Sequence, residues 1–477
     1  MSQPLCWEFR HEQEENPFRP GSTRPFKVTL HTSSFKDLSP RQLVALDLVR
    51  ELAPVGEIDL LDTDPGTPRH IRIGERKPGG GGADYVDVTV WENGESRLFT
   101  GVSYPDQKLT TACAVVGTSD RSDPRVLSAY SDLLVAAAHR TLNRDLLITE
   151  STTLQHPICR NDARLSNART ILEATKVVGL FLRSRDKYVF SAQRRSLLDR
   201  TRFDRSLFYL VLARELTPRM WRYVGACHEL EKQRNDDSAA LSWSALTRCK
   251  HALQARDLIG EAFYGPHSDQ ARDDTEYHFD YLTLLLVGAL DAQARIAHRV
   301  YGMYGSERLV NFRRPDFLNE LRRRGAQQLH SLLTETPVVS FLTLLVSVRN
   351  TIHGASLGSH GYHTTGKGPG WIEIAEGELS TQIWESAKSA GGAASWGLTK
   401  FRHRLGTDGP LAEPVRLVHY PYGRRLVEEG IRLVDRVAEA TEIERAFSTL
   451  VIDRWTDAPP DEFPFTADIR NRLAALG

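Results

Sequence analysis

The chain lacks the cysteine pattern of a disulfide-stabilised or zinc-binding protein. Its five cysteines are odd in number and scattered without close pairs, at Cys6, Cys113, Cys159, Cys227 and Cys249. Disulfide frameworks and zinc sites need cysteines that are paired or closely spaced. We therefore expect neither of these, and a reducing cytosol as the natural environment.

Long apolar runs are also missing. A transmembrane helix needs about 20 consecutive apolar residues, and the longest runs, such as residues 281–290, are shorter. The first residues, MSQPLCWEFRHEQEENPF, are charged and lack the apolar segment of a signal peptide. These features predict a cytoplasmic protein without a membrane partner.

The chain has no net charge that would point to nucleic acid. Lysine plus arginine and aspartate plus glutamate each number 61, so a basic surface has to be local. Two segments offer one: residues 183–205, with eight Arg or Lys against three Asp, and a short arginine run. If the chain binds RNA, we expect phosphate contacts from Arg194, Arg195, Arg322, Arg323 and Arg324.

Strand and helix patterns alternate in the first third of the chain, after a polar lead at residues 1–24. This alternation over residues 25–182 indicates an α/β domain with a mainly parallel sheet. The predicted strands are 25–30, 57–61, 85–91, 96–102 and 145–149, the third and fourth forming a hairpin at Glu92-Asn-Gly94. The predicted helices are 39–52, 124–142 and one that ends near Arg183.

The last helix–strand step of this domain carries two acidic residues. It reads DLLVAAAH from Asp132 and DLLITE up to Glu150, and it resembles the corresponding step of PIN-like domains. That resemblance implies that Asp132 and Glu150 hold Mg²⁺ for RNA cleavage, because Mg²⁺ prefers hard oxygen ligands. At the end of the first strand, however, His31 stands where the family has an aspartate. A degenerate PIN-like domain could instead recognise RNA or a trigger, and Asp132 could simply cap a helix.

Helical patterns dominate after a basic linker at residues 183–205. Residues 206–355 predict a helical domain, a Gly-rich segment with β structure is expected at 356–422, and residues 423–477 hold a final bundle helix and a tail. The predicted helices are 206–214, 218–232, 239–263, 276–304, 317–333, the helix from Val339, and 423–450. Short strands are expected at 371–374 and 381–384.

The helix predicted from Val339 to Gly354, VSFLTLLVSVRNTIHG, has polar residues at the end of an apolar run. Arg349 and His353 are four residues apart, so they share one face of the helix. Charged groups are rarely buried without a partner. We therefore expect this helix end to open onto a cleft, a partner or a polyanion.

An apolar helix that ends in arginine, a polar residue and histidine resembles the HEPN superfamily. The resemblance implies a helical bundle and a metal-independent endoribonuclease of a bacterial toxin or antiviral defence system. It assigns phosphate stabilisation to Arg349, orientation to Asn350 and proton transfer to His353. It also implies a homodimer, with an antitoxin or a phage component as a further partner.

Two departures keep other functions open. Only three residues separate Arg349 and His353, where the family generally has four to six, and His31 replaces an aspartate. One alternative is a non-catalytic RNA-binding sensor or scaffold in which both domains are degenerate. The other is a metal-dependent nuclease at the PIN-like domain, which would need Mg²⁺, whereas the HEPN-type reaction needs no cofactor.

Overall fold

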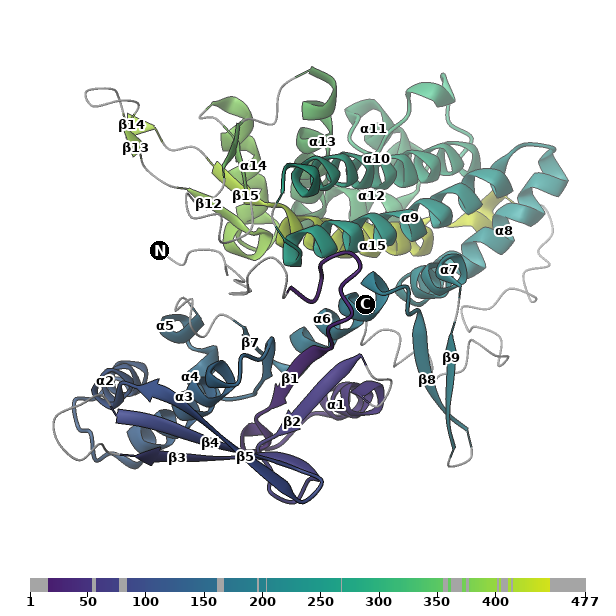
Figure 1. Ribbon diagram of the computed structural model, residues 1–477. Coiled ribbons are helices and arrows are strands. Elements are labelled where there is room, and N and C mark those ends of the chain that lie inside the picture. Colours follow the sequence, from purple (N-terminus) through teal and green to yellow (C-terminus); the bar gives the residue numbers. More distant parts are fainter. Residues whose placement is uncertain are drawn as a thin grey trace. The chain divides into compact units, whose positions relative to one another are not determined.

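The computed structural model (Figure 1) divides the chain into two compact units. The first runs to Lys187 and includes Ser191–Arg200, and the second contains Tyr188–Phe190 and the described residues from Thr201 to Ala446. The structure describes residues 16–53, 57–76, 84–160, 167–194, 197–202, 204–266, 268–354, 359–361, 371–374, 377–400, 403–404, 411–412 and 415–446.

Seven of the described strands of the first unit form one mixed sheet in the order β5-β4-β3-β2-β1-β6-β7. Neighbouring strands from β3 through β2, β1 and β6 to β7 are parallel, whereas β3, β4 and β5 pair antiparallel. The predicted α/β domain with a mainly parallel sheet is confirmed. The strands are β1 Phe26–Leu30, β2 Ile58–Asp62, β3 Arg69–Arg76, β4 Asp84–Glu92, β5 Glu95–Ser103, β6 Leu146–Ile148 and β7 Ala168–Arg169.

The helices of this unit cover the sheet in two groups. Helix α1 (Pro40–Leu52) packs against α6 (Ile171–Ser184), while α2 (Pro105–Val116) packs against α3 (Pro124–Thr141). Two short helices, α4 (Thr152–Gln155) and α5 (Pro157–Arg160), follow β6. The predicted cap of α1 is confirmed, because Ser39 Oγ accepts a hydrogen bond from the backbone N–H of Gln42 (3.3 Å).

The sequence analysis did not predict strand β3 and helix α2, nor the short elements α4, α5 and β7. Strand β3 alternates Ile71 and Ile73 with polar residues, a period-2 signal hidden among four charged side chains. In helix α2 only Ala112 is buried, so its sequence has almost no apolar stripe from which a helix could be predicted. Strand β3 is held by its pairing with β2 and β4, and helix α2 by its packing against α3.

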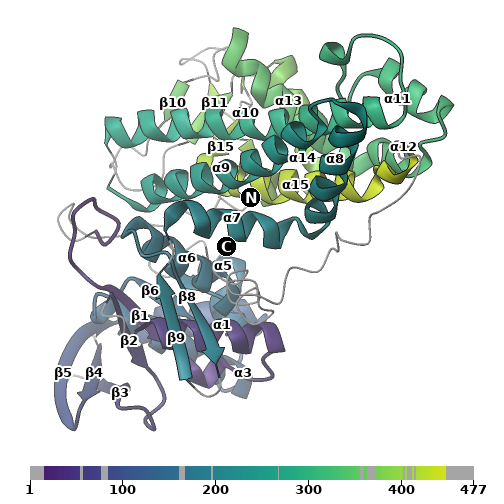
Figure 2. The same ribbon diagram turned by 90° about the vertical axis from the view of Figure 1, so that its right-hand side faces the viewer.

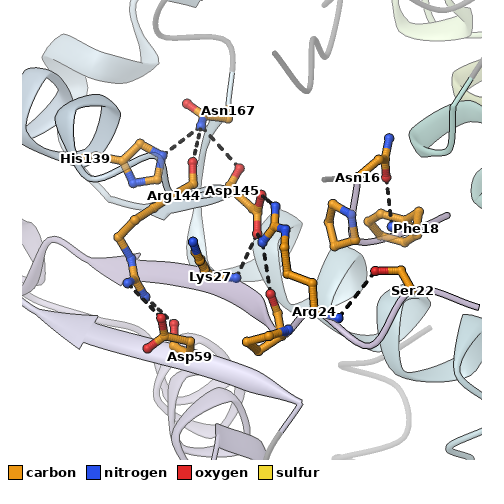
Figure 3. Close-up of polar contacts among 12 residues, drawn as sticks. Asn16, Phe18, Ser22, Arg24, Lys27, Asp59, His139, Arg144, Asp145 and Asn167 are labelled. Atoms are coloured by element: carbon orange, nitrogen blue, oxygen red, sulfur yellow. Dashed lines mark hydrogen bonds and ion pairs between the residues drawn. The ribbon is translucent and has the colours of Figure 1, made fainter. Parts of the chain in front are cut away.

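A buried charge network joins the amino ends of the central strands (Figure 3). Both oxygens of Asp145, whose side chain is fully buried, accept from the Arg24 guanidinium, at 2.7 and 2.5 Å. Asp145 Oδ2 also accepts from the Lys27 backbone N–H (2.8 Å). Beside it, buried Arg144 pairs with Asp59 on β2 (3.1 Å). These contacts tie the chain before β1, β2 and the start of β6 together.

His139, at the end of α3, is the neutral member of this network. Asn167 Nδ2 donates to His139 Nε2 (2.7 Å) and to the Asp145 carbonyl (3.2 Å), which leaves the His139 Nδ1–H to donate to Thr29 Oγ1 (3.1 Å). Burial and, to a smaller extent, the charge of Arg144 lower the pKa of His139, Asp145 acts in the opposite direction, and the resulting pKa is about 3. The folded unit therefore holds this imidazole in its neutral form, with a single ring proton on Nδ1.

The second unit is mainly helical, and Figure 2 shows its three longest helices side by side. They are α9 (Ser238–Tyr264), α10 (Asp269–Val300) and α15 (His419–Ala440). Helix α15 approaches α10 closely at Gly430, where an added Cβ would lie 2.9 Å from Leu286 Cδ2. The other described helices are α7 Arg205–Leu216, α8 Pro218–Arg234, α11 Pro315–Arg323, α12 Gln327–Thr334, α13 Thr336–Gly354 and α14 Glu378–Ser389.

Short strands accompany this helical unit. Strands β10 (Ser359–Gly361), β11 (Trp371–Ile374), β15 (Val415–Val418) and β12 (Leu398–Lys400) form an antiparallel sheet in that order. A second pair, β13 (His403–Arg404) and β14 (Leu411–Ala412), is also antiparallel. The predicted strand at 371–374 is confirmed.

Four predicted elements in the second half of the sequence were wrong in type or in their bounds. Residues 381–384 belong to helix α14, whose buried Ile383 and Ala387 are four apart, a helical spacing read as a strand. The predicted helix 317–333 is two helices, because Gly325 adopts a left-handed conformation (φ +70°). Helix α10 begins at Asp269 and ends at Val300, and α15 spans His419–Ala440 rather than 423–450, whose last residues lie outside the described part.

The basic segment at 183–205 contains ordered elements. Helix α6 continues to Ser184, and β8 (Val189–Arg194) pairs with β9 (Leu197–Arg202) as a hairpin. Six-residue runs such as VFSAQR carry the β-branched and aromatic residues of strands. The many charged residues of this segment had led to the prediction of a linker, and the strand pattern was missed.

No single helix in the described part of the chain is long and apolar enough to cross a membrane. Helices α12 and α13, bent by 67°, meet the length and composition criteria only when taken together.

We predict that Asp145→Asn destabilises the first unit. The change keeps the side-chain shape but leaves the Arg24 guanidinium without its buried counter-ion, and breaking such a pair costs about 3–5 kcal/mol. Urea unfolding followed by circular dichroism measures the loss. The control is Asp106→Asn, which removes an exposed pair with Arg121 and should cost less than about 1 kcal/mol. Equal losses in both variants would contradict the prediction.

Stability should also fall as the pH drops below about 6.5, the ordinary histidine pKa. In this range the unfolded chain takes up a proton at His139, while the folded chain, whose His139 pKa is lowered to about 3, does not. Each pH unit then costs up to about 1.4 kcal/mol. Urea unfolding between pH 7.5 and 5 should show this slope, and His139→Gln should reduce it. An unchanged slope in the variant would refute a neutral buried His139.

Candidate functional site

The apolar run of α13 places Arg349 at the edge of the helical core. Leu344, Leu345 and Val348 are fully buried, Arg349 is half-buried and Asn350 is exposed. The predicted helix from 339 is confirmed and begins three residues earlier, at Thr336. The polar end of α13 therefore emerges from the core toward the surface, as the sequence predicts.

The Arg349 guanidinium makes weak contacts within the protein. Its Nη1 lies 3.4 Å from Asn350 Oδ1, at the upper limit for a hydrogen bond. Its Nε is buried and has no hydrogen-bond partner among the described residues. A buried donor without a partner costs free energy, and such a group suits an anionic ligand.

Asp291 of α10 lies close enough to Arg349 for the two charges to interact. Burial raises the pKa of the Asp291 carboxyl, while Arg295, Arg349 and Arg248 act in the opposite direction. Arg248 is itself fixed, because its Nη1 donates to the Gly288 carbonyl (3.1 Å). Around this one carboxylate the arginines are in excess, so the site has a net positive character.

A pocket of about 200 Å³ lies between α10, α13 and the segment before α11. Its polar lining comes from Asp291, Asn311, Arg313 and Arg349. Apolar side chains supply the rest of the wall: Val287, Leu290, Phe312, Leu342, Leu345 and Val346. A small apolar pocket with a few polar groups beside a cation is a typical arrangement for binding an anionic ligand that has an apolar part.

His353 is placed by its backbone alone. It belongs to α13, one helical turn beyond Arg349, so the two residues share one face of the helix. The side chain of His353 lies outside the described part of the chain. Of the predicted catalytic residues, the structure therefore brings Arg349 to the pocket and Asn350 into contact with Arg349.

Three polar residues of this pocket were not predicted. The sequence showed Asp291 and Arg295 four apart on a helix, but gave no reason to place Asp291 near Arg349, 58 positions later. Asn311 and Arg313 lie in a connecting segment without a motif. Only one signal was available for Asp291: an acidic residue in a helix segment that is otherwise mostly apolar.

The predicted RNA-contacting arginines lie elsewhere. Arg324 Nε pairs with Glu320 Oε1 (3.0 Å) and its guanidinium lies over the Tyr304 ring, while Arg323 also pairs with Glu320. Arg322 is exposed, and none of the three lines the Arg349 pocket. The side chain of Arg194 and the whole of Arg195 lie outside the described residues.

The PIN-like candidates meet at the carboxyl edge of the first sheet. Asp132 Oδ2 accepts from Ser151 Oγ (2.5 Å), and Asp132 Oδ1 is 3.6 Å from His31 Nε2. Glu150 Oε1 accepts from the Ile171 backbone N–H (2.8 Å), so it caps α6. Burial lowers the pKa of His31, and Asp132 opposes that change.

This donor set does not fit Mg²⁺. Both carboxylates are used in contacts within the unit, and an imidazole stands where a third oxygen ligand is expected. In the part of the chain that the structure describes, no group of three or more His, Cys, Asp or Glu side chains is arranged to hold a metal ion.

No protein-family model matches the chain, and no curated protein or solved structure is significantly similar to it.

We predict that Arg349→Gln raises the pKa of Asp291 further, because it removes one of the three cations that favour the ionised carboxyl. Carbon-13 NMR of aspartate-labelled protein measures this pKa, with the resonance assigned by its loss in Asp291→Asn. The control is Arg432→Gln, which removes a cation paired with Glu429 on α15. An Asp291 pKa unchanged by Arg349→Gln would mean that the two groups do not interact.

Proposed function

We propose that the chain is a metal-independent endoribonuclease whose active site is the end of α13. The observation that carries the proposal is the Arg349 guanidinium, held at the edge of a pocket with its Nε unpartnered among the described residues. A phosphodiester supplies the anionic oxygens that such a fork of donors binds. The resemblance of the Arg349–His353 segment to HEPN nucleases supports RNA as the polymer.

In the proposed reaction the 2′-hydroxyl of the substrate is the nucleophile. His353 accepts the 2′-hydroxyl proton, and the 2′-oxygen forms a bond to the adjacent phosphorus. The bond from phosphorus to the 5′-oxygen breaks, and that oxygen takes up a proton from solvent, to which His353 later releases the proton that it accepted. The products are a 2′,3′-cyclic phosphate and a 5′-hydroxyl end, so atoms and charge balance without a cofactor.

The other residues of the site have distinct parts in this reaction. Arg349 binds the scissile phosphate and stabilises the negative charge that grows on its oxygens in the transition state. Asn350, 3.4 Å from the guanidinium, helps to orient it. An unperturbed histidine has a pKa near neutral pH, which suits His353 to proton transfer in either direction.

The proposal includes the cellular setting that the resemblance implies. A cytoplasmic RNA nuclease of this kind is a toxin or an antiviral effector, and it requires control by an antitoxin or a phage-derived trigger. A homodimer would bring two α13 ends to one cleft. The arginines of the basic segments, Arg194, Arg195 and Arg322–Arg324, remain candidates for wider RNA contacts.

The second candidate function is a non-catalytic RNA-binding sensor or scaffold. Two observations favour it: the short spacing of Arg349 and His353, and the pairing of Asp132 with His31 and Ser151 at the sheet edge. The third candidate, metal-dependent cleavage at Asp132 and Glu150, would require both carboxylates to leave their present contacts.

Cleavage of total RNA by purified protein tests the proposal. We expect wild-type protein to produce fragments with 2′,3′-cyclic phosphate ends in the presence of EDTA. Arg349→Ala should lower the rate about 10²–10³-fold, because it removes the transition-state charge stabiliser. His353→Ala should lower it about 10²–10⁴-fold. Gel analysis with end-group mapping measures both effects.

The control is Arg121→Ala, which removes an exposed arginine of α2's neighbouring loop that pairs with Asp106. It should cleave at the wild-type rate. Cleavage that stops with EDTA and survives both α13 substitutions would transfer the activity to a metal site. Binding of RNA without cleavage, with or without Mg²⁺ and with coexpressed phage components, would favour the sensor.

A further inference from the structure

The pocket beside Arg349 is too small for a whole nucleotide but suits a single ring system. Its volume of about 200 Å³ is below the roughly 300 Å³ at which sites for drug-sized ligands begin. Six apolar side chains line it, including the ring of Phe312. Arg349, at the same pocket, is the residue assigned to the phosphate, so a nucleobase next to that phosphate is within reach of the pocket.

The polar groups of the pocket carry a specific hydrogen-bonding pattern. Asp291 is a carboxylate, which accepts hydrogen bonds through two oxygens and donates none when ionised. Burial raises the pKa of the Asp291 carboxyl, and three arginines, Arg295, Arg349 and Arg248, oppose that shift and favour the ionised form. The Asn311 Oδ1 already accepts from the Arg313 backbone N–H (3.1 Å), so the amide NH₂ of Asn311 remains as a donor.

We propose that this pocket binds guanine and makes the nuclease cut beside a guanosine. Among the four RNA bases, only guanine presents two adjacent N–H donors, N1–H and N2–H, on its Watson–Crick edge, with the O6 acceptor next to them. The Asp291 carboxylate matches the two donors, and the Asn311 amide matches O6. The inference rests on the proposed RNA-cleaving function for its phosphate site.

The other bases lack this match. Adenine and cytosine each present a single amino donor beside a ring-nitrogen acceptor, which would face the Asp291 carboxylate with like-signed lone pairs. Uracil offers one N–H between two carbonyl oxygens. A site whose buried polar group is left unpaired rejects the wrong ligand strongly. Specificity is therefore expected to depend on Asp291 more than on the apolar wall.

Binding to uncleavable RNA tests the pocket separately from catalysis. The probes are four fluorescein-labelled tetranucleotides with 2′-fluoro sugars, identical except for G, A, C or U at one internal position. Without a 2′-hydroxyl they cannot be cut by the proposed reaction. Fluorescence anisotropy should show that wild-type protein binds the G probe at least about tenfold more tightly than the other three, a preference that charge-assisted hydrogen bonds supply.

Asp291→Asn is the matched variant. It keeps the shape of the side chain, but an amide offers one acceptor oxygen instead of two. We expect it to bind the G and A probes within about twofold of each other. The control is Asp280→Asn on the same helix: Asp280 also has a raised carboxyl pKa caused by burial, but it does not line the pocket. This control should keep the wild-type preference for G.

Cleavage-site mapping on a mixed RNA pool is the second readout. Wild type and Asp280→Asn should cut with guanine at one fixed position beside the break, and Asp291→Asn should cut without that preference. Circular dichroism establishes that each variant is folded. Equal binding of all four probes, or binding of none, would overturn the guanine pocket, as would a G preference that survives Asp291→Asn.

The failures of the two proposals look different. If the protein cuts RNA in an Arg349-dependent manner without base preference, the nuclease proposal is supported and the guanine proposal is refuted. If it binds the G probe through Asp291 but cuts no RNA, the guanine proposal is supported and the nuclease proposal is refuted.

Discussion

The packing of α13 against α10 is the constraint on which the candidate site depends. Each helix has an apolar face that has to leave water, and burying Leu342 and Leu345 of α13 brings the helix alongside Leu290 of α10. This packing places two charged residues, Arg349 and Asp291, at the margin of the apolar contact. Among the described residues, the one hydrogen bond of the Arg349 side chain is the 3.4 Å contact with Asn350. Hydrophobic burial therefore positions a cation that can still bind a ligand.

The two units solve the problem of buried charge in opposite ways. At the amino edge of the first sheet, Arg24, Asp145, Arg144 and Asp59 satisfy each other within the protein, and His139 stays neutral among them. That network pairs its charges within the unit, although Arg144 Nε also has no hydrogen-bond partner among the described residues. In the Arg349 pocket the guanidinium keeps a buried Nε without a partner among the described residues. The feature that marks Arg349 as part of a candidate site is that its side chain lines a pocket together with Asp291.

The carboxyl edge of the first sheet occupies an intermediate position. Parallel α/β sheets bind ligands at this edge, beside the point where the strand order reverses, and β1 and β6 meet there. Yet Asp132 is bonded to Ser151, Glu150 caps α6, and His31 is buried with a lowered pKa. Asp132 and Glu150, the two acidic residues that PIN-like chemistry would use, are engaged in contacts within the unit, and His31 replaces the aspartate expected on β1. This arrangement suits a structural role better than Mg²⁺ binding.

The sequence by itself determined the local structure and the order of the two units. Alternating β-branched residues located β1, the Glu92-Asn-Gly94 turn located the β4–β5 hairpin, the Ser39–Pro40 pair located the start of α1, and the long apolar run located α13. These signals act within a few residues. Where local signals are weak the prediction failed: the helix break at Gly325 was missed, and residues 381–384 of α14 were predicted as a strand. Only the tertiary structure decided which side chains meet: Asp145 with Arg24, His31 with Asp132, and Asp291 with Arg349. Those contacts join residues 58 to 121 positions apart, and their geometry follows from how whole helices and strands pack, which no short sequence pattern encodes.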